Sequence, residues 1–570
     1  MKQHYYSSLA SALAFGFLFL AGADAHAQAP AWQSALAVGT ASGSTSDLIT
    51  AATDGSGNVF VAGDFNGTIT LGSSTLTSGG VQSTFVAKWN PTTSTWLWAL
   101  PVTHTAESFV SKLAVVGNTV YLTGFFSNTV TIGNQTLSSA GATDLYVTKL
   151  TDNGTNGSVN WAQRAGGAGI DICRSLAVQG SNVYVAGQST SAVATFGSTS
   201  VNATANGTAY LAKLTDTGST GNWTWAQAVG NATSASIFNG LTVQGSSVYA
   251  AGIFGGNLAY GSSQLSTTSS PSDYDALVIK LTDQGSSFTP VWARQIGGSG
   301  TEFGTSVASV GNAVYVGGLF ASPTLSAGPS TLPNQGGFDV FVAKLLDAGA
   351  TNSVAWAQGA GGAGSENVYA LAVQGSSVYV GGDFSSTTAA FGTTTLTAQG
   401  STDAFVARLV DAGSAASFAW ATRAGSPTGT SGTYALVLRG TQVLAAGTTQ
   451  GVAQFGSQSI STTTTNTYGF LASLTDGVGL ASVPTTLVEQ VSLYPNPARE
   501  QVVLALPAHL GRQPVSATLV DALGRTMRTL ALPAQRAHPH SLDLRELAPG
   551  VYTLHLRTEA GLLVKKLVIE

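Results

Sequence analysis

Residues 399–420 read QGSTDAFVARLVDAGSAASFAW, and this stretch contains the parts from which most of the chain is built. An alternating apolar segment, Phe405–Arg408, leads through a turn at Asp411 and Gly413 to a second segment that ends in Trp420, which precedes Ala. The same Trp-Ala pair recurs at intervals of 63 to 67 residues, at Trp98, Trp161, Trp225, Trp292, Trp356 and Trp420, and Trp32 lies 66 residues before the first copy. A fixed period of this length indicates a repeat architecture.

Each period contains the same pieces in the same order. An apolar stretch such as Leu371–Val373 leads through a Gly-containing turn into an alternating segment, Val378–Gly382, which predicts a hairpin. A Ser/Thr-rich connection with a pair such as Phe391-Gly392 predicts a small extra hairpin before the third strand. The Trp strand is the fourth. The segments alternate with a period of two and show no helical pattern, so we predict four strands per period.

The two ends of the repeat region complement each other. Six complete four-strand units run from Leu48 to Trp420, and a seventh supplies only three strands, the last of which ends near Ser473. Its missing fourth strand is found around Trp32. A closed ring needs one sheet made from both termini, whereas a linear stack gains nothing from this offset. We therefore predict an all-β chain in which residues 28–476 form a seven-bladed β-propeller closed by an N-terminal strand.

These units resemble bacterial β-propeller repeats with a Gly-x-x-Asp-x-Phe-Val-Ala-Lys core, which is best seen at residues 400–408. The resemblance covers nearly 450 residues and implies the fold. Because the functions of that family are diverse, it implies little about activity.

Composition excludes several classes of protein. The chain has 570 residues, with 22 Lys and Arg against 27 Asp and Glu, so its weak net charge of −5 gives no electrostatic footprint for nucleic acid. Its 69 glycines follow no period of three, which excludes collagen. The single cysteine, Cys173, cannot close an intrachain disulfide, and without a His cluster it cannot build a structural zinc site.

The N-terminus has the layout of a secretory signal peptide. Lys2 precedes an apolar run from Leu9 to Ala23, and the small-x-small triplet of residues 25–27 follows. The run is shorter than the roughly 20 apolar residues that a spanning helix needs, so we predict a signal peptide at residues 1–27 rather than a membrane anchor. No later apolar run reaches that length, and the mature chain is expected to lack a transmembrane segment.

The charged-residue content of the sequence changes after Asp476. Residues 488–570 hold 9 of the 22 basic and 7 of the 27 acidic residues, which marks a second domain after a linker at residues 477–487. Seven short alternating runs in this segment predict a small Ig-like β-sandwich.

The same segment resembles the type A C-terminal sorting domain of type IX secretion cargo. Five fragments match in order, at residues 493–497, 519–525, 542–544, 547–552 and 565–568. The residues that carry the resemblance are Tyr494, Pro495, Asn496, Pro497, Asp521, Gly524, Arg525, Asp543, Gly550, Tyr552, Lys565 and Lys566. The resemblance implies Sec export followed by passage through the type IX translocon of a gram-negative cell, with the protein anchored at the surface or released. The alternative is an ordinary Ig-like accessory domain that binds carbohydrate.

Acidic residues recur about ten positions after several of the Trp copies. The set is Asp47, Glu107, Asp171, Glu302 and Glu366. In a propeller they would form an incomplete ring near one mouth of the channel, where carboxylates bind a divalent cation or the hydroxyls of a sugar. The interpretation that we favour is that each accepts hydrogen bonds from backbone N–H groups of its Gly-rich loop. We predict no other cofactor.

Two further recurrent features have structural explanations. An acid and a base lie five residues apart in the third strand, as in Asp403 and Arg408. Because this spacing puts them on opposite faces, we expect them to occupy separate solvated or turn positions. Trp89, Trp96 and Trp223 fall outside the Trp period and are candidates for stacking on sugars.

Catalysis has little support in the sequence, and we predict no catalytic residue. His104 is the only histidine of the repeat region. We therefore expect a secreted or cell-surface, non-enzymatic binding or adhesion protein whose propeller contacts a polysaccharide or a surface protein. The alternatives are a secreted carbohydrate-active enzyme that uses an acid pair among Glu107, Glu302 and Glu366, and a purely structural surface component.

Overall fold

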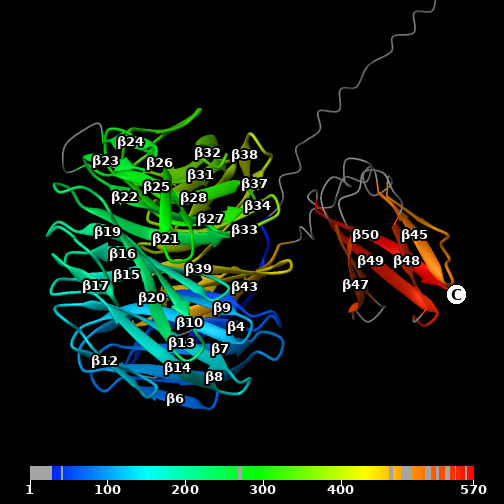
Figure 1. Cartoon of the computed structure of the whole chain (residues 1–570), viewed down its shortest axis with the longest axis horizontal. Helices are drawn as coiled ribbons and strands as arrows, with labels where there is room; N and C mark the ends of the chain where they lie inside the picture. Colours follow the sequence, from blue (N-terminus) through cyan, green and yellow to red (C-terminus); the bar gives the residue numbers. More distant parts are fainter. Residues whose placement is uncertain are drawn as a thin grey trace, which may run out of the picture.

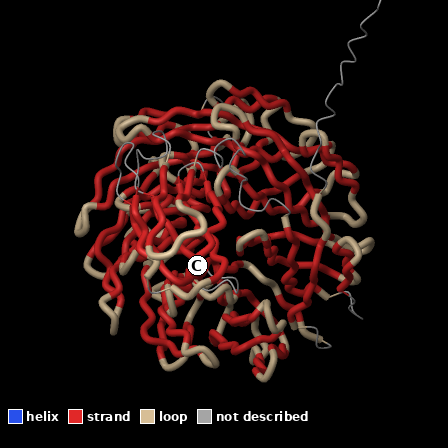
Figure 2. The backbone as a smooth tube through the Cα atoms, turned by 90° about the vertical axis from the view of Figure 1, so that its right-hand side faces the viewer, coloured by secondary structure: helices blue, strands red, loops and turns tan. Residues whose placement is uncertain are grey.

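The computed structural model describes residues 29–39, 43–267, 273–460, 466–476, 491–506, 515–520, 526–532, 540–545, 547–558 and 561–570. Strands joined by short loops make up these residues, and Figure 2 shows no helix among them. The chain is therefore all-β, as predicted. The predicted signal peptide at residues 1–27 and the predicted linker at residues 477–487 lie outside the described residues.

The repeat region folds into successive antiparallel sheets of four main strands each, numbered here in chain order (Figure 1). Sheet 1 has β3 (Thr50–Thr53), β4 (Val59–Asn66), β7 (Ser83–Asn90) and β8 (Thr95–His104), with the short β2 (Thr45–Ser46) also on β4. Sheet 2 has β9 (Ser108–Val116), β10 (Thr119–Phe126), β13 (Asp144–Asp152) and β14 (Gly157–Ala165). Sheet 3 has β15 (Asp171–Gln179), β16 (Asn182–Ser189), β19 (Thr208–Asp216) and β20 (Gly221–Val229). Sheet 4 has β21 (Ser236–Gln244), β22 (Ser247–Phe254), β25 (Asp275–Asp283) and β26 (Phe288–Ile296).

The later sheets follow the same plan. Sheet 5 has β27 (Glu302–Val310), β28 (Ala313–Phe320), β31 (Asp339–Asp347) and β32 (Asn352–Gly362), and sheet 6 has β33 (Glu366–Gln374), β34 (Ser377–Phe384), β37 (Asp403–Asp411) and β38 (Ala416–Ala424). Sheet 7 has β39 (Ser431–Arg439), β40 (Gln442–Gln450), β43 (Thr467–Thr475) and β1 (Trp32–Val38).

The extra hairpin predicted between the second and third strands is present in every repeat unit, and in two units it pairs with the fourth strand of the preceding sheet, β11 with β8 and β35 with β32. Its copies are β5 (Thr68–Leu71) with β6 (Ser74–Thr77), β11 (Thr129–Ile132) with β12 (Gln135–Ser138), β17 (Ala194–Phe196) with β18 (Thr199–Val201), β23 (Asn257–Tyr260) with β24 (Ser263–Ser266), β29 (Thr324–Ala327) with β30 (Ser330–Pro333), β35 (Thr388–Phe391) with β36 (Thr394–Thr397), and β41 (Ala453–Phe455) with β42 (Gln458–Ile460).

The seven sheets follow one another around a ring, in which the last sheet contacts the first. The first strand of each sheet contacts the first strand of the next, from β3 and β9 through to β33 and β39, and β39 contacts β3. In Figure 1 the yellow strands of sheet 7 accordingly lie beside the blue strands of sheet 1. This arrangement is that of a β-propeller-like fold. Sheet 7 is completed by β1, which pairs with β43 in a register that places Ala35 opposite Ala472.

The position of Trp32 within that strand differs from the prediction. In sheet 2, Trp161 lies opposite Lys149, and in sheet 7 the corresponding partners are Ser34 and Ser473. Trp32 therefore lies two residues before the Trp position. Its ring packs edge-on against Phe455 with a centroid distance of 5.4 Å. The spacing of 66 residues was longer than the usual 64 because Trp32 does not belong to the Trp series.

Consecutive sheets are joined by a buried contact that we call the interblade latch. The Asp of an Asp-x-Gly turn accepts hydrogen bonds from the Lys, the Trp and the Tyr of the preceding sheet. Asp347 of sheet 5 accepts from Lys280 Nζ at 2.5 Å, Tyr249 OH at 2.6 Å and Trp292 Nε1 at 3.2 Å, and Gly349 N caps it at 3.0 Å. The same set of contacts surrounds Asp216, Asp283 and Asp411. Asp152 and Asp476 form partial versions.

The latch corrects the expectation for the charged residues of the third strand. The Lys does not lie at a solvated position, because it reaches across to the turn of the next sheet and is buried there; Lys213, for example, pairs with Asp283. The acid at the start of the same strand is also buried, as Asp403 shows. Burial alone would raise the pKa of Asp347, but its hydrogen bonds from Lys280, Tyr249 and Trp292 outweigh burial and hold the pKa below the usual range.

The junction between sheets 7 and 1 is built differently. The latch positions there are occupied by Ser473, Leu444, Ser34 and Pro91 in place of Lys, Tyr, Trp and Asp. Ser34 and Ser473 share a hydrogen bond of 2.7 Å, and a cavity of about 250 Å³ lies among these residues and Trp89. This junction therefore lacks the ionic latch. Gly469 N of sheet 7 donates to Ser46 Oγ of sheet 1 at 3.0 Å, and β1 leads from its pairing with β43 into sheet 1.

The C-terminal residues form two sheets around one core. One sheet contains β44 (Ser492–Tyr494), β45 (Gln501–Ala505) and β48 (His540–Asp543), and the other contains β46 (Val515–Val520), β47 (Thr526–Leu532), β49 (Gly550–Thr558) and β50 (Gly561–Ile569). Val502, Leu504, Leu519, Leu554 and Leu567 are buried in a shared apolar cluster. The sequence predicted seven strands for this segment, and the described residues contain seven.

Replacing Asp347 by Asn should destabilise the full chain by about 3 kcal/mol, because Lys280 stays buried without its counter-ion. The measurement is the free energy of unfolding in denaturant. Asp543→Asn is the control, since Asp543 pairs with Arg545 at the surface, and it should leave the midpoint unchanged. Equal effects of the two substitutions would show that the latch does not hold the sheets together.

Candidate functional site

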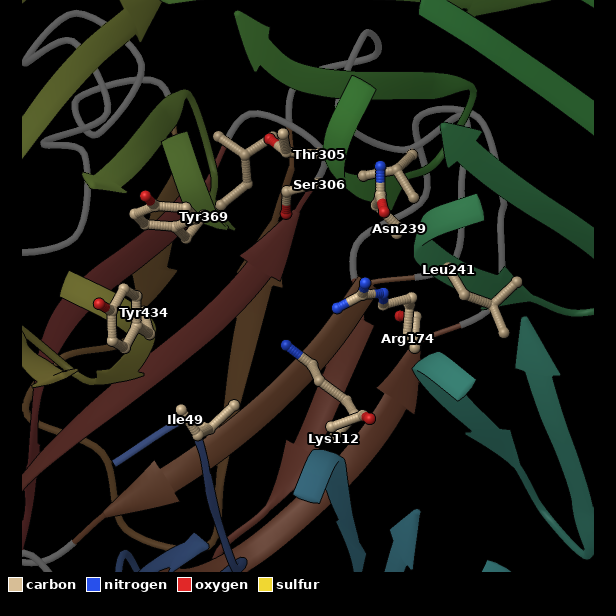
Figure 3. Close-up of a pocket in the computed structure, with 14 residues that line it drawn as sticks. Ile49, Lys112, Arg174, Asn239, Leu241, Thr305, Ser306, Tyr369 and Tyr434 are labelled. Atoms are coloured by element: carbon tan, nitrogen blue, oxygen red, sulfur yellow. The ribbon is translucent and has the colours of Figure 1, made fainter. Parts of the chain in front are cut away.

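A cavity of about 410 Å³ lies where the first strands of all the sheets meet (Figure 3). We call it the central cavity. Sheets 2 to 7 each contribute the residue at the same position of the first strand, and sheet 1 contributes the residue directly before β3. These residues are Ile49, Ser111, Arg174, Asn239, Thr305, Tyr369 and Tyr434. The cavity is thus a product of the ring, and no single sheet could form it.

A β-bulge aims these side chains at the cavity. In β15 the pairing with β16 shifts between Cys173 and Ser175, which leaves Arg174 as the extra residue. The same shift occurs in the first strands of sheets 2 to 7. A bulge bends its strand and re-aims a side chain.

The bulge depends on a glycine in the second strand. A Cβ on Gly187 would lie 1.9 Å from the carbonyl oxygen of Ile172, a distance that no real Cβ tolerates. A Cβ added to the equivalent glycines would lie 1.7 to 2.1 Å from a carbonyl oxygen of the neighbouring segment, and these glycines are Gly63, Gly124, Gly252, Gly318, Gly382 and Gly447. The invariant glycine and the variable bulge residue are therefore two halves of one local structure.

The bulge residues differ from sheet to sheet, in contrast to the latch residues. Two of the small ones link neighbouring sheets: Ser111 Oγ donates to the carbonyl oxygen of Cys173 at 2.5 Å, and Asn239 Nδ2 donates to that of Gly304 at 3.0 Å. Arg174, at the same position, makes no such link to a described residue. Variation at one cavity-lining position of an otherwise similar repeat is the pattern of a specific surface on a shared scaffold.

Lys112, like Arg174, differs in charge from the residues at the same position of the other sheets. It follows the bulge in β9, and the corresponding residues of the other sheets are Thr50, Ser175, Gly240, Ser306, Ala370 and Ala435. Figure 3 shows the long side chains of Lys112 and Arg174 reaching into the cavity. Burial lowers the pKa of both groups. None of the residues that line the cavity is an acid, so its local charge is positive.

The opposite wall is aromatic, and acids that do not line the cavity lie behind it. The rings of Tyr369 and Tyr434 meet edge to face with a centroid distance of 5.0 Å, and Tyr369 OH donates to Asp383 Oδ2 at 3.0 Å. In sheet 1, burial raises the pKa of Asp47 to about 6 and that of Asp64 to about 7. Asp64 is held by hydrogen bonds, which include one from the backbone N–H of Val110 at 3.1 Å.

The five acids predicted as a ring do not line the central cavity. Asp171, Glu302 and Glu366 are fully buried, and each accepts a hydrogen bond from a backbone N–H of its own Gly-rich loop, from Gly167, Gly298 and Gly362 at 2.7 to 2.8 Å. Ser hydroxyl groups donate to the same carboxylates. These are the contacts expected of loop-anchoring acids. Asp47 is half-buried in sheet 1, and Glu107 is exposed.

The described residues contain no group of three or more His, Cys, Asp or Glu side chains that could hold a metal ion. The candidates for sugar stacking are also placed differently from the expectation. Trp223 is buried against Phe196, and the half-buried rings of Trp89 and Trp96 pack on each other at 5.0 Å.

The motif residues of the C-terminal segment are mostly at its surface. Tyr494, Pro495, Asn496 and Pro497 are exposed, and Asn496 binds the last strand, because its Nδ2 donates to the carbonyl oxygen of Lys566 at 2.8 Å and its Oδ1 accepts from Val568 N at 2.9 Å. Tyr552 is buried and donates to the carbonyl oxygen of Ala548 at 2.7 Å. Gly550 begins β49, Lys565 lies in β50, and Asp543 is exposed. Asp521, Gly524 and Arg525 lie outside the described residues.

Sequence reasoning missed the residues of the central cavity. The signal lay two positions before the apolar stretch of each first strand. Arg174, Tyr369 and Tyr434 occupy this position in different repeats, although the residues around them are similar. Because the residue at this position differs between most sheets, it produces no repeat signal.

Comparison with known proteins identifies the C-terminal segment. Residues 492–570 match the family described as the secretion system C-terminal sorting domain. The chain is therefore exported by type IX secretion to the cell surface or the extracellular space. None of the described residues forms a helix long and apolar enough to cross a membrane. No curated protein matches the sequence.

Two solved structures resemble the chain at a distance. One is a Bacteroides uniformis ATCC 8492 protein provisionally described as a 6-phosphogluconolactonase, which is 10% identical with a TM-score of 0.38 and covers 75% of this chain and 99% of its own. The other, with the same provisional description, is from Bacteroides fragilis NCTC 9343 and is 9% identical with a TM-score of 0.35, covering 88% of this chain and 99% of its own. Likenesses of this strength assign no activity.

The raised pKa values of Asp47 and Asp64 predict a pH dependence of stability. The folded state holds protons on these carboxyl groups that the unfolded chain has already released, so the free energy of unfolding should fall as pH rises from 5 to 7.5, by up to about 1.4 kcal/mol per pH unit for each proton. Asp64→Asn should flatten the slope and stabilise the chain at pH 7.5. Asp543→Asn should leave the slope unchanged, because its Arg545 partner keeps the pKa of Asp543 far below this window. A slope that Asp64→Asn does not alter would refute this assignment.

Proposed function

We propose that this protein is a seven-bladed β-propeller that acts outside the cell as a non-enzymatic binding protein, with the central cavity as its ligand site. Each of the sheets 1 to 7 is one blade, residues 28–476 form the propeller, and residues 488–570 form an Ig-like sorting domain. The export route supports an extracellular role.

One observation carries the binding role. The first strands of sheets 2 to 7 share the bulge, yet the residues that the bulge directs to the cavity run from Ser111 through Arg174 to Tyr369. The fold needs a bulge and a glycine here but no particular side chain. A cavity lined by unlike polar and aromatic groups from separate blades has the makeup of a ligand site.

The positions of the acids Glu302 and Glu366 favour a binding role over a catalytic one. A glycosidase needs two carboxyl groups that flank one bond. Glu302 and Glu366 are instead buried in different loops with their oxygens occupied by Gly and Ser donors. The polar groups that reach the cavity are hydroxyl, amide and cationic groups, which bind and orient a ligand.

A glycan array probed with the secreted full chain tests this proposal. We expect retention on a subset of polysaccharides, and loss of at least about tenfold in affinity with Tyr369→Ala, because a half-exposed aromatic ring in the cavity supplies the contact face for a sugar. Ser200→Ala in the exposed hairpin strand β18 is the matched control and should bind normally.

Two results would overturn the proposal. Retention that Tyr369→Ala leaves intact would move the binding site away from the central cavity. Release of new reducing ends from a retained glycan would show that the protein is an enzyme.

A further inference from the structure

Two cationic side chains enter the central cavity from directly adjacent strands. Ser111 of β9 donates to the carbonyl oxygen of Cys173 in β15 at 2.5 Å, so the residues that follow each of these, Lys112 and Arg174, come from neighbouring points of the wall. Figure 3 shows both reaching into the cavity.

Neither cation has a partner among the described residues, which sets the pair apart from the other basic residues of the ring interior. Each buried base of the third strands is matched with an acid: Lys88 with Asp152, Lys149 with Asp216, Lys213 with Asp283, Lys280 with Asp347, Lys344 with Asp411 and Arg408 with Asp476. A partly desolvated charge without a counter-ion is unfavourable. Arg174 is exposed and Lys112 is half-buried, so Lys112 in particular costs the folded ring stability that the latch residues do not.

The fold does not require either charge. The position of Lys112 accepts Gly240 in sheet 4 and Ala370 in sheet 6, and the position of Arg174 accepts Ser111 in sheet 2. Two cations that the fold does not need lie side by side in a cavity that no acid lines, and one of them is half-buried. An anion that is supplied from outside explains this pair.

We infer that Lys112 and Arg174 together hold a carboxylate of the ligand, and that the ligand is an acidic saccharide. This inference rests on the proposed function and gives it a ligand class. The planar guanidinium group of Arg174 matches a carboxylate with two parallel hydrogen bonds, and Lys112 adds a point charge. Thr305 and Ser306 line the same cavity from sheet 5 and offer hydroxyl groups to the sugar, and the exposed ring of Tyr369 offers an apolar face.

Titration calorimetry of the full chain with tetragalacturonate and with its methyl ester tests the ligand class. Esterification removes the charge and keeps the sugar, so the acid should bind at least about tenfold more tightly than the ester. Sodium sulfate and sodium phosphate are the third and fourth probes. Lys112→Met and Arg174→Gln should each weaken binding of the acid by about tenfold or more, and Arg499→Gln, which removes an exposed charge of the C-terminal segment, should not.

The ligand-free stability of Lys112→Met separates a binding residue from a structural one. Because Met fills the same space without a charge, the unfolding midpoint of this variant should rise by about 1–3 °C. A fall in the midpoint would make Lys112 a structural residue and overturn the inference.

The remaining outcomes distinguish the two levels of the proposal. Equal affinity for acid and ester, with loss in Tyr369→Ala, would overturn the acidic ligand and leave the binding function in place. Tight, Lys112-dependent binding of sulfate or phosphate without binding of the tetragalacturonate would overturn the carboxylate assignment. Saccharide binding that ignores Tyr369, Lys112 and Arg174 alike would overturn both.

Discussion

The carboxylate of the Asp-x-Gly turn is the contact on which the ring depends. Each sheet alone exposes apolar faces. The Asp binds the preceding sheet by accepting hydrogen bonds from its Lys, Trp and Tyr, as at Asp347. Only 9% of the residues are charged, and a large share of the charges in the repeats serve this purpose. Because the Lys is buried with its acid, loss of either partner leaves a charge without compensation.

The ring has one junction without this contact, and it lies where the two ends of the repeat region meet. Between sheets 7 and 1, Ser473 and Pro91 replace the Lys and the Asp, and the strand β1 supplies the connection through its pairing with β43. The ring is thus closed by backbone hydrogen bonds between residues more than 400 positions apart. Where strand pairing fixes the geometry, an ionic contact is dispensable.

Much of this arrangement could be predicted from the sequence, because the same alternating segments recur in every period and mark the strands. The hairpins, the order of the strands and the use of β1 follow from local alternation and from the offset between the two termini. The latch could not be predicted in this way, because Lys280 and Asp347 are 67 residues apart and the five-residue spacing within the strand only excluded the nearer acid as a partner. The cavity residues escaped for the opposite reason, since a bulge changes which way Arg174 points and no local pattern reports it.

The repeated and the unrepeated residues therefore have separate tasks in our account, the first to close the ring and the second to bind a ligand in its centre. Ring closure is the claim that everything else requires. It can be tested most directly with the double variant Ala35→Cys, Ala472→Cys, whose residues lie opposite each other in β1 and β43. We predict an intrachain disulfide in the monomer under mild oxidation, detected by mass spectrometry of the linked peptides. Absence of that link, or a link formed only between two molecules, would contradict a ring closed by its N-terminal strand.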